Sequence, residues 1–231
     1  MKKLVVLTGA GISAESGLST FRDSGGLWEG YDVMQVASID GWHRNKELVL
    51  EFYNMRRKQS ANAKPNRGHL ALKELEKDFD VTIITQNVDD LHEKAGSENI
   101  IHLHGKLNES KSSLDPSLIY PVKDHEINLG DKCEKGSQLR PNIVWFGEAV
   151  PVMEAAVCEV IKADILVIIG TSLVVYPAAG LLNYAPDDSI KYIIDPNIPE
   201  IYNPIPNLNF IPEKATIGVV KLLKELKDRN S

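Results

Sequence analysis

Polar side chains with catalytic potential gather in two short segments near the middle of the chain. The first, TQNVDDLH (85–92), carries Gln86, Asn87 and Asp89 directly after the apolar run VTIIT (81–85). Amide and carboxylate groups suit the binding of ribose hydroxyls or of a carboxamide. Any one of them also fits a polar turn in which Asn87 caps the next helix. Three such groups within four residues, at the end of a strand, favour a binding site.

The second segment, IIHLHGKL (100–107), places His102 and His104 two residues apart. On an extended segment they point to the same side. Such a pair can chelate a metal, or one of them can act as a general base, because imidazole titrates near neutral pH. A lone histidine is more often structural, but Gly105 leaves room for a ligand beside His104. His104 is therefore the candidate base.

A glycine-rich loop, GAGISAESGLSTFRDSGGLW (9–28), follows the first apolar run. Gly9, Gly11 and Ala14 match GxGxxA, in which glycines let the backbone approach a phosphate and the following helix offers free N–H groups. The match alone also fits a tight strand-to-helix turn. A dehydrogenase needs a second strand ending in an acidic residue about 20 residues on. Asp32 lies near that distance, but the preceding SGGLWEGY is no buried strand, which argues against hydride transfer.

Alternating strands and helices position these segments. Four continuous apolar runs predict buried parallel strands: LVVL (4–7), VTIIT (81–85), ILVIIG (165–170) and YIID (192–195). Helical spacing predicts helices over Asn45–Ser60, Gly68–Phe79, Met153–Lys162 and Ala215–Lys227. This pattern predicts an α/β fold with a Rossmann-like, doubly wound parallel sheet, whose ligands bind beyond the carboxyl ends of the strands.

Two regions, the first with a predicted helix and the second polar, interrupt the alternation and predict a small inserted lobe within a single catalytic domain. We expect the large lobe over about 1–27, 62–105 and 141–231, and the small lobe over about 28–61 and 106–140.

Composition limits the partners. The chain has 231 residues and a net charge of -6, which argues against a direct nucleic-acid partner. No apolar run reaches the roughly 20 residues of a membrane helix, so we expect a cytoplasmic protein with no membrane partner, acting as a monomer. The two cysteines, Cys133 and Cys158, are too few for a four-cysteine metal site. Cys158 lies on a predicted helix, where we expect a small buried residue.

The motifs GAGISAESGLSTFR, TQNVDDLH, LHG, VWFGE and GTSLVVYP occur in an order that resembles the sirtuin family of NAD-dependent protein deacylases. The resemblance extends from about residue 4 to about residue 220. It implies a class III-like deacylase that acts on acylated-lysine proteins or peptides. The acyl oxygen attacks the nicotinamide ribose as nicotinamide leaves, and the products are free lysine, nicotinamide and O-acyl-ADP-ribose.

The resemblance also implies roles for individual residues. His104 is the general base, with Asn87 and Asp89 in the catalytic set, and Phe21 shields the reaction centre. The implied NAD-binding residues are Gly9, Ala10, Gly11, Ile12, Ser13, Glu15, Thr20, Phe21, Arg22, Trp28, Gln86, Asn87, Val88, Asp89, Gly170, Thr171, Ser172, Asp195 and Ala215. The family commonly has Asn where this chain has Asp195, and a carboxylate can accept bonds from both ribose hydroxyls.

The implied substrate-binding residues are Tyr53, Arg56, Val144, Phe146, Gly147 and Glu148. A strand from Val144 to Gly147 is expected to pair with the peptide backbone.

Tyr53 and Arg56 narrow the range of acyl groups that we expect the enzyme to remove. They stand at i and i+3, so they share a helix face, whereas Arg57 lies off it. A sirtuin subgroup with this Tyr-x-x-Arg pair recognises succinyl, malonyl or glutaryl groups. A guanidinium holds a carboxylate through two parallel hydrogen bonds, and the Tyr hydroxyl adds a third. We therefore expect a desuccinylase or demalonylase with some deacetylase activity. The alternative is a surface helix with a half-buried Tyr53 and a solvated Arg56.

One departure concerns the metal. The family usually has four zinc-binding cysteines after the catalytic histidine, and only Cys133 lies between His104 and Trp145. We expect no zinc. Apolar packing is expected to hold the small lobe together, rather than a metal site built from other side chains. The expected packing residues are Leu114, Leu118, Ile119, Tyr120 and Ile127, and the rejected ligands are Cys133, His125, Asp131 and Glu134.

Two other functions stay open at this point. One is an NAD- or ADP-ribose-binding module without turnover, which the missing cysteines favour and His104 argues against. The other is a mono-ADP-ribosyltransferase that cleaves the same cofactor.

Overall fold

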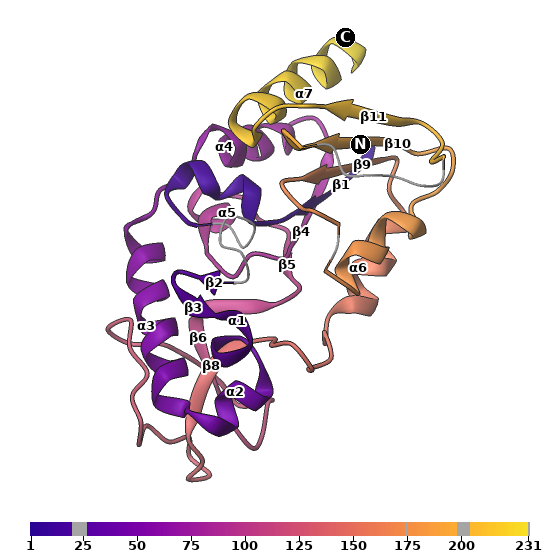
Figure 1. Ribbon diagram of the computed structural model, residues 1–231. Helices are drawn as coiled ribbons and strands as arrows, with labels where there is room; N and C mark the ends of the chain where they lie inside the picture. Colours follow the sequence, from indigo (N-terminus) through magenta and orange to yellow (C-terminus); the bar gives the residue numbers. More distant parts are fainter. Residues whose placement is uncertain (20–26, 174, 198–203, 231) are drawn as a thin grey trace.

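The computed structural model describes residues 1–19, 27–173, 175–197 and 204–230 (Figure 1). Three of the implied NAD-binding residues, Thr20, Phe21 and Arg22, lie outside these ranges, so their roles stay predictions.

A six-stranded parallel sheet forms the centre of the large lobe, in the order β11-β10-β9-β1-β4-β5. Its strands are β1 (Lys3–Thr8), β4 (Asp80–Thr85), β5 (Ile100–His102), β9 (Ile165–Ile169), β10 (Ile190–Ile194) and β11 (Leu208–Ile211). Along the chain, β4 and β5 are added on one side of β1, and then β9, β10 and β11 are added on its other side. The order therefore reverses between β1 and β9, which is where doubly wound sheets bind ligands. The predicted fold class is confirmed.

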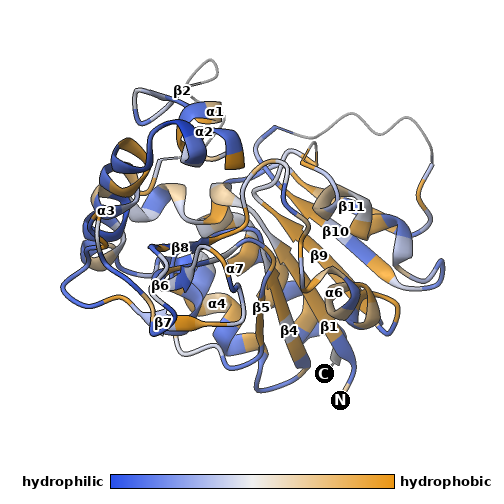
Figure 2. Ribbon diagram, turned by 90° about the horizontal axis from the view of Figure 1, so that it is seen from below, coloured by the Kyte–Doolittle hydropathy of each residue, from blue (hydrophilic) through white to orange (hydrophobic). Residues whose placement is uncertain are grey.

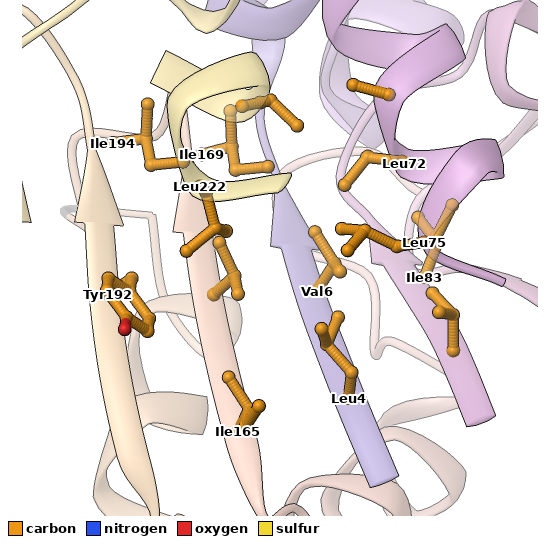
Figure 3. Close-up of a cluster of buried hydrophobic side chains, with 14 of the residues drawn as sticks. Leu4, Val6, Leu72, Leu75, Ile83, Ile165, Ile169, Tyr192, Ile194 and Leu222 are labelled. Carbon is orange, nitrogen blue, oxygen red and sulfur yellow. The ribbon is translucent and has the colours of Figure 1, made fainter. Parts of the chain in front are cut away.

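Helices cover both faces of this sheet (Figure 1). One face carries α4 (Arg67–Leu75) and α7 (Ala215–Asn230), and the other carries α6 (Met153–Val160) and the 3₁₀ helix η3 (Ala178–Tyr184). Successive β1 side chains enter opposite cores. Leu4 and Val6 pack with Leu72 and Leu75 of α4 (Figure 3), whereas Val5 and Leu7 pack with α6 and η3. This two-sided burial explains why the strands read as continuous apolar runs.

The small lobe joins two regions that are far apart in the sequence (Figure 1). Its helices are α1 (Val33–Val36), α2 (Ile39–Arg44) and α3 (Lys46–Asn62). A three-stranded antiparallel sheet contains β6 (Gly105–Ser112), β7 (Ile119–Pro121) and β8 (Leu139–Ile143), and a hairpin contains β2 (Leu27–Trp28) and β3 (Tyr31–Asp32). Figure 2 shows hydrophobic central strands in the large sheet and a largely hydrophilic α3. The boundaries of the two lobes remain our proposal.

The small lobe is packed differently from the expectation. Leu114 is 84% exposed, and Ile119 is 49% exposed on the edge strand β7. The prediction that both fill the core is wrong, although Ile127 is buried as expected. Helices α1 to α3 supply most of the core, together with Leu107, Ile143 and Trp145, and so leave β7 little to cover.

Two other expectations are corrected. Cys158 is exposed, because Ala156 and Val160 form the face of α6 that packs on the sheet. The glycine loop continues into two 3₁₀ turns, η1 (Ala10–Ile12) and η2 (Ala14–Ser16), instead of an α-helix. A four-residue helix, α5 (Leu91–Lys94), follows the TQNVDD segment. Within the described ranges, every helix is too short or too polar to cross a bilayer.

Candidate active site

The glycine loop touches the turn after β9 at the point where the strand order reverses. Gly9 N–H donates to Ile169 O, and Gly11 N–H donates to Gly170 O, both at 2.9 Å. A Cβ added at Gly11 would lie 2.6 Å from Gly170 Cα, and Gly170 itself has a φ of +60°. Only glycine fits so close an approach between two backbones. The glycines therefore allow the backbones of the two loops to contact each other directly.

The turns after the glycines tie the loop to the rest of the large lobe. Ile12 is buried in the core beneath Ala10 and Gly11. Glu15 accepts a 2.7 Å hydrogen bond from Thr216 Oγ1, next to the buried Ala215 at the start of α7. Ala215 is thus close to the glycine loop, although its contact with adenine stays a prediction.

Ser13, Asn87 and Asp89 form one buried hydrogen-bonded network. Asn87 Nδ2 donates to Gly9 O and to Ser13 Oγ, each at 3.1 Å, and Ser13 Oγ donates to Asp89 Oδ2 at 3.0 Å. Asp89 Oδ1 also accepts from Leu91 N–H. Burial raises the pKa of Asp89, and the bonds from Leu91 and Ser13 oppose that rise. The structure thus brings together three side chains that the sequence assigned to one site.

Gln86 and Val88 connect this network to neighbouring elements. Gln86 Nε2 donates to Thr171 Oγ1 at 3.1 Å, which links the ends of β4 and β9. Val88 O accepts from Leu107 N–H at 2.8 Å and so joins the site to the small lobe.

The donors and acceptors at this edge fit NAD. Among the described residues, no hydrogen bond uses the N–H groups of Thr171 and Ser172, so both can donate to pyrophosphate oxygens. Asp195 follows β10, is 2% exposed and accepts a 2.9 Å hydrogen bond from Asn197 N–H, and its contact with a ribose hydroxyl stays a prediction. The individual contacts to NAD remain predictions.

His104 is held in the form that a general base needs. Its Nδ1 lies 3.1 Å from Gln86 O. A carbonyl can only accept, so Nδ1 carries the hydrogen and Nε2 keeps its lone pair. Nε2 forms no hydrogen bond to any described residue. Burial lowers the pKa of His104, and the bond to Gln86 opposes the shift, so burial favours the neutral ring.

His102 has a different environment. Its Nε2 lies 2.8 Å from Glu93 Oε1, and its Nδ1 lies 3.3 Å from Asn87 O. Burial favours a higher pKa for Glu93, but the His102 hydrogen bond outweighs it and the pKa falls to about 2. Both ring nitrogens are thus occupied, and His102 supports Asn87. Across the described ranges, no three His, Cys, Asp or Glu side chains group as metal ligands would.

Tyr53 and Arg56 are both buried, at 0% and 5% exposure, so the alternative of a solvated Arg56 is wrong. Tyr53 Oη accepts from Trp145 Nε1 at 2.9 Å, which leaves the Tyr53 hydroxyl proton free to donate. Arg56 Nη1 donates to Glu29 Oε1 at 3.1 Å and to Gln59 Oε1 at 3.2 Å.

Trp28 contacts Arg56, whereas Arg57, the next residue along α3, has a different partner. The Arg56 guanidinium lies 4.9 Å from the ring centroid of Trp28, a residue expected to bind NAD. Arg57 points elsewhere, as expected, and its Nε donates to Leu107 O.

The expected strand from Val144 to Gly147 is wrong, because β8 ends at Ile143. Val144 N–H donates to His104 O, and Phe146 N–H donates to Ala37 O. Gly147 then turns the chain with a φ of +90°. These bonds join the segment to His104 and to Ala37, the residue that follows α1. Pairing with a substrate peptide stays a prediction.

Glu148, expected to contact substrate, is already engaged within the protein. Its carboxylate accepts two bonds from Arg140, at 2.7 and 2.9 Å, and one from Trp145 N–H. Burial would raise the pKa of Glu148, but the Arg140 bonds lower it. Glu148 thus holds the turn that carries Phe146, which is 43% exposed.

Sequence reasoning missed three residues at this site. Glu29 pairs with Arg56, Trp145 binds Tyr53, and Asn66 donates from Nδ2 to Ile12 O and Ser16 Oγ. Only Asn66 has a recognisable signal in the sequence, because Asn is favoured just before a helix and a helix is predicted from Gly68.

Comparisons with known proteins agree with this geometry. The model of the Sir2 family matches residues 9–177. An NAD-dependent protein deacylase of Bacteroides thetaiotaomicron is 62% identical over 201 residues, covering 85% of this chain and 86% of the relative. One of Helicobacter pylori is 54% identical over 226 residues, covering 98% of both chains.

Solved structures extend the likeness to the whole fold. A Sir2 homologue in complex with NAD superposes with a TM-score of 0.89 at 39% identity, covering 100% of this chain and 91% of the other. A Sir2 complex with p53 peptide and NAD has a TM-score of 0.80 at 29% identity, covering 98% and 94%.

Proposed function

The chain belongs to the Sir2 family, and on this premise we propose that it is an NAD-dependent protein-lysine deacylase that prefers acyl groups ending in a carboxylate. Succinyl, malonyl and glutaryl lysine are the preferred substrates, and acetyl lysine is a weaker one. Curated relatives that share 54–62% of their residues are NAD-dependent protein deacylases, which supports the reaction class. The cytoplasmic location and the monomeric state of the protein stay predictions from the sequence.

When bound, NAD would supply an electrophilic ribose carbon with nicotinamide as its leaving group. The chain's residues then have separate tasks. The Ser13–Asn87–Asp89 network holds the loops after β1 and β4 in one geometry, so their polar groups need no reorganisation. His104 takes a proton from a ribose hydroxyl at Nε2, the nitrogen that its bond to Gln86 O leaves unprotonated.

The observation that carries the acyl preference is the burial of Arg56 beside Tyr53. Arg56 Nε is buried and has no hydrogen-bond partner among the described residues, and the Tyr53 hydroxyl proton is free. An unpaired buried donor costs about 1–3 kcal/mol. An acyl carboxylate would satisfy these donors, whereas an acetyl methyl group would leave them unpaired, and such sites discriminate strongly.

The test is a panel of acetyl, succinyl, malonyl and glutaryl lysine peptides with NAD, followed by mass spectrometry. We expect free lysine and O-acyl-ADP-ribose, with a higher kcat/KM for the acidic acyl groups. Binding of NAD without either product would favour the binding-module alternative. Transfer of the ADP-ribose of labelled NAD onto protein would favour the transferase alternative.

A further inference from the structure

The Arg56 guanidinium already has a carboxylate partner within the chain. Glu29 Oε1 lies 3.1 Å from Arg56 Nη1, and the two side chains are 21% and 6% exposed. An acyl carboxylate that binds Arg56 therefore approaches a cation that another carboxylate has neutralised. Two carboxylates at one guanidinium repel each other, and partial burial strengthens that repulsion.

The backbone at Glu29 is unusual for a glutamate. Glu29 and Gly30 form the two-residue turn between β2 and β3, with φ values of +54° and +85°. Asn, Asp or Gly is preferred at the first position of such a turn. A residue with a Cβ rarely adopts this conformation, and its presence justifies a functional hypothesis. The turn chemistry does not explain a glutamate here, whereas the ion pair with Arg56 does.

Arg56 does not depend on Glu29 to stay in place. Its guanidinium packs over the Trp28 ring at 4.9 Å, and Nη1 also donates to Gln59 Oε1. Burial lowers the pKa of Arg56, and the charge of Glu29 opposes that shift. Without Glu29, stacking and the Gln59 bond still orient the side chain, and its positive charge becomes available to a ligand.

We propose that Glu29 is a specificity-determining residue, an internal counter-ion that the acyl carboxylate must displace or outcompete at Arg56. The inference rests on the proposed function, in which Arg56 binds that carboxylate. Glu29 lowers the affinity for acidic acyl groups and leaves the affinity for acetyl groups unchanged. It thereby sets how far the enzyme discriminates between the two classes.

The experiment compares KM and kcat for succinyl and acetyl peptides in the wild type, Glu29→Gln and Glu29→Asn. Gln keeps the size of the side chain, and Asn suits the left-handed turn, so the pair separates charge from backbone effects. Glu126→Gln is the matched control, because Glu126 also pairs with a cation of α3, Lys58, at 2.6 Å, but on an exposed surface. Thermal unfolding of each variant checks its folding.

We expect both Glu29 variants to lower KM for succinyl peptide by about fivefold, with the acetyl KM and the Glu126→Gln kinetics unchanged. Equal changes for both peptides, no change, or a higher succinyl KM would overturn the inference, the last because Glu29 would then be positioning Arg56.

The same data separate this inference from the proposed function. If the wild type shows no preference for succinyl but Glu29→Gln gains one, the counter-ion role stands and the proposed function fails. If the wild type prefers succinyl and Glu29→Gln does not strengthen that preference, the proposed function stands and the inference fails. If no variant uses succinyl peptide, both are wrong.

Discussion

Hydrogen bonds at single residues decide which side chain can do which task. His102 and His104 stand two positions apart, yet Glu93 and Asn87 occupy both nitrogens of His102, while Gln86 O occupies only one nitrogen of His104. The difference leaves one lone pair at the site, on His104.

The lowered pKa of His104 predicts the pH dependence of the reaction. A base is active when unprotonated, so activity is lost as the pH falls through its pKa. Burial brings that pKa below 6.5, and kcat/KM should therefore be flat above pH 7, with the midpoint of its acid limb below 6.5. A pH profile of deacylation checks this, and a midpoint above 6.5 would contradict it. His104→Asn should lower kcat by about 10²–10⁴-fold without unfolding the protein.

The sequence predicts candidate residues by their chemical types but not by their partners. Asn87, Asp89 and His104 stand out because amide, carboxylate and imidazole groups follow buried strands. The pairing of Glu29 with Arg56 joins positions 27 residues apart through a turn and a helix. That contact depends on how the hairpin packs on α3, which neither local pattern contains.

At the scale of elements, one side chain joins a helix start to the glycine loop. Asn66 Oδ1 caps α4 by accepting from Gly68 N–H, while its Nδ2 donates to Ile12 O at 2.8 Å and to Ser16 Oγ at 2.9 Å. The start of α4 therefore fixes the position of the 3₁₀ turns after β1.

Asn66→Ala should raise KM for NAD as well as reduce stability, because it frees the loop in addition to removing a cap. Asn45→Ala is the control. Asn45 caps α3 by accepting from Leu48 N–H at 3.0 Å and is not hydrogen-bonded to any described residue of the glycine loop. Each substitution should reduce the free energy of unfolding by about 0.5–2 kcal/mol, measured by urea titration. A similar KM for NAD in the two variants would show that the Asn66 bonds do not position the loop.

Elements buried on both faces were predicted well, and partly exposed ones were not. The runs at β1, β4, β9 and β10 are apolar throughout because helices cover both sides. Strand β6, GKLNESKS, is largely polar, and Leu107 is its only large apolar residue, so it gave no strand signal. The segment after β8 was expected to extend as a strand, but β8 ends at Ile143, and Phe146 N–H donates to Ala37 O instead of to β6.

For the molecule as a whole, two buried histidines make stability depend on pH. His69 and His92 are 0% and 1% exposed, with ring centroids 5.0 Å apart. His92 Nε2 contacts Thr8 Oγ1 at 3.1 Å, at the end of β1. Burial lowers the pKa of His69 to about 4 and that of His92 to about 3. These neutral rings join α4 and α5 to the centre of the sheet.

Stability should therefore fall as the pH is lowered below 6.5. Between pH 6.5 and about 4, these histidines are protonated in the unfolded state but stay neutral in the folded state. The free energy of unfolding therefore decreases as the pH falls, by roughly 3 kcal/mol per histidine over the full window. Well above pH 6.5 both histidines are neutral in the folded and the unfolded state, so they no longer make the free energy of unfolding depend on pH. Urea unfolding at several pH values should show a shallower decline for His92→Gln than for the wild type, with the exposed His43→Gln unchanged. Equal slopes in all three would exclude a role for His92.

The most direct test of the whole account is the ratio of kcat/KM for succinyl peptide to kcat/KM for acetyl peptide, in the wild type and in Arg56→Met. Hydrogen bonds to a charged group contribute about 1.5–3 kcal/mol, so the ratio should fall by about 10- to 100-fold in Arg56→Met, while acetyl turnover with NAD persists. An unchanged ratio, or an equal loss of both activities in a folded variant, would contradict the account.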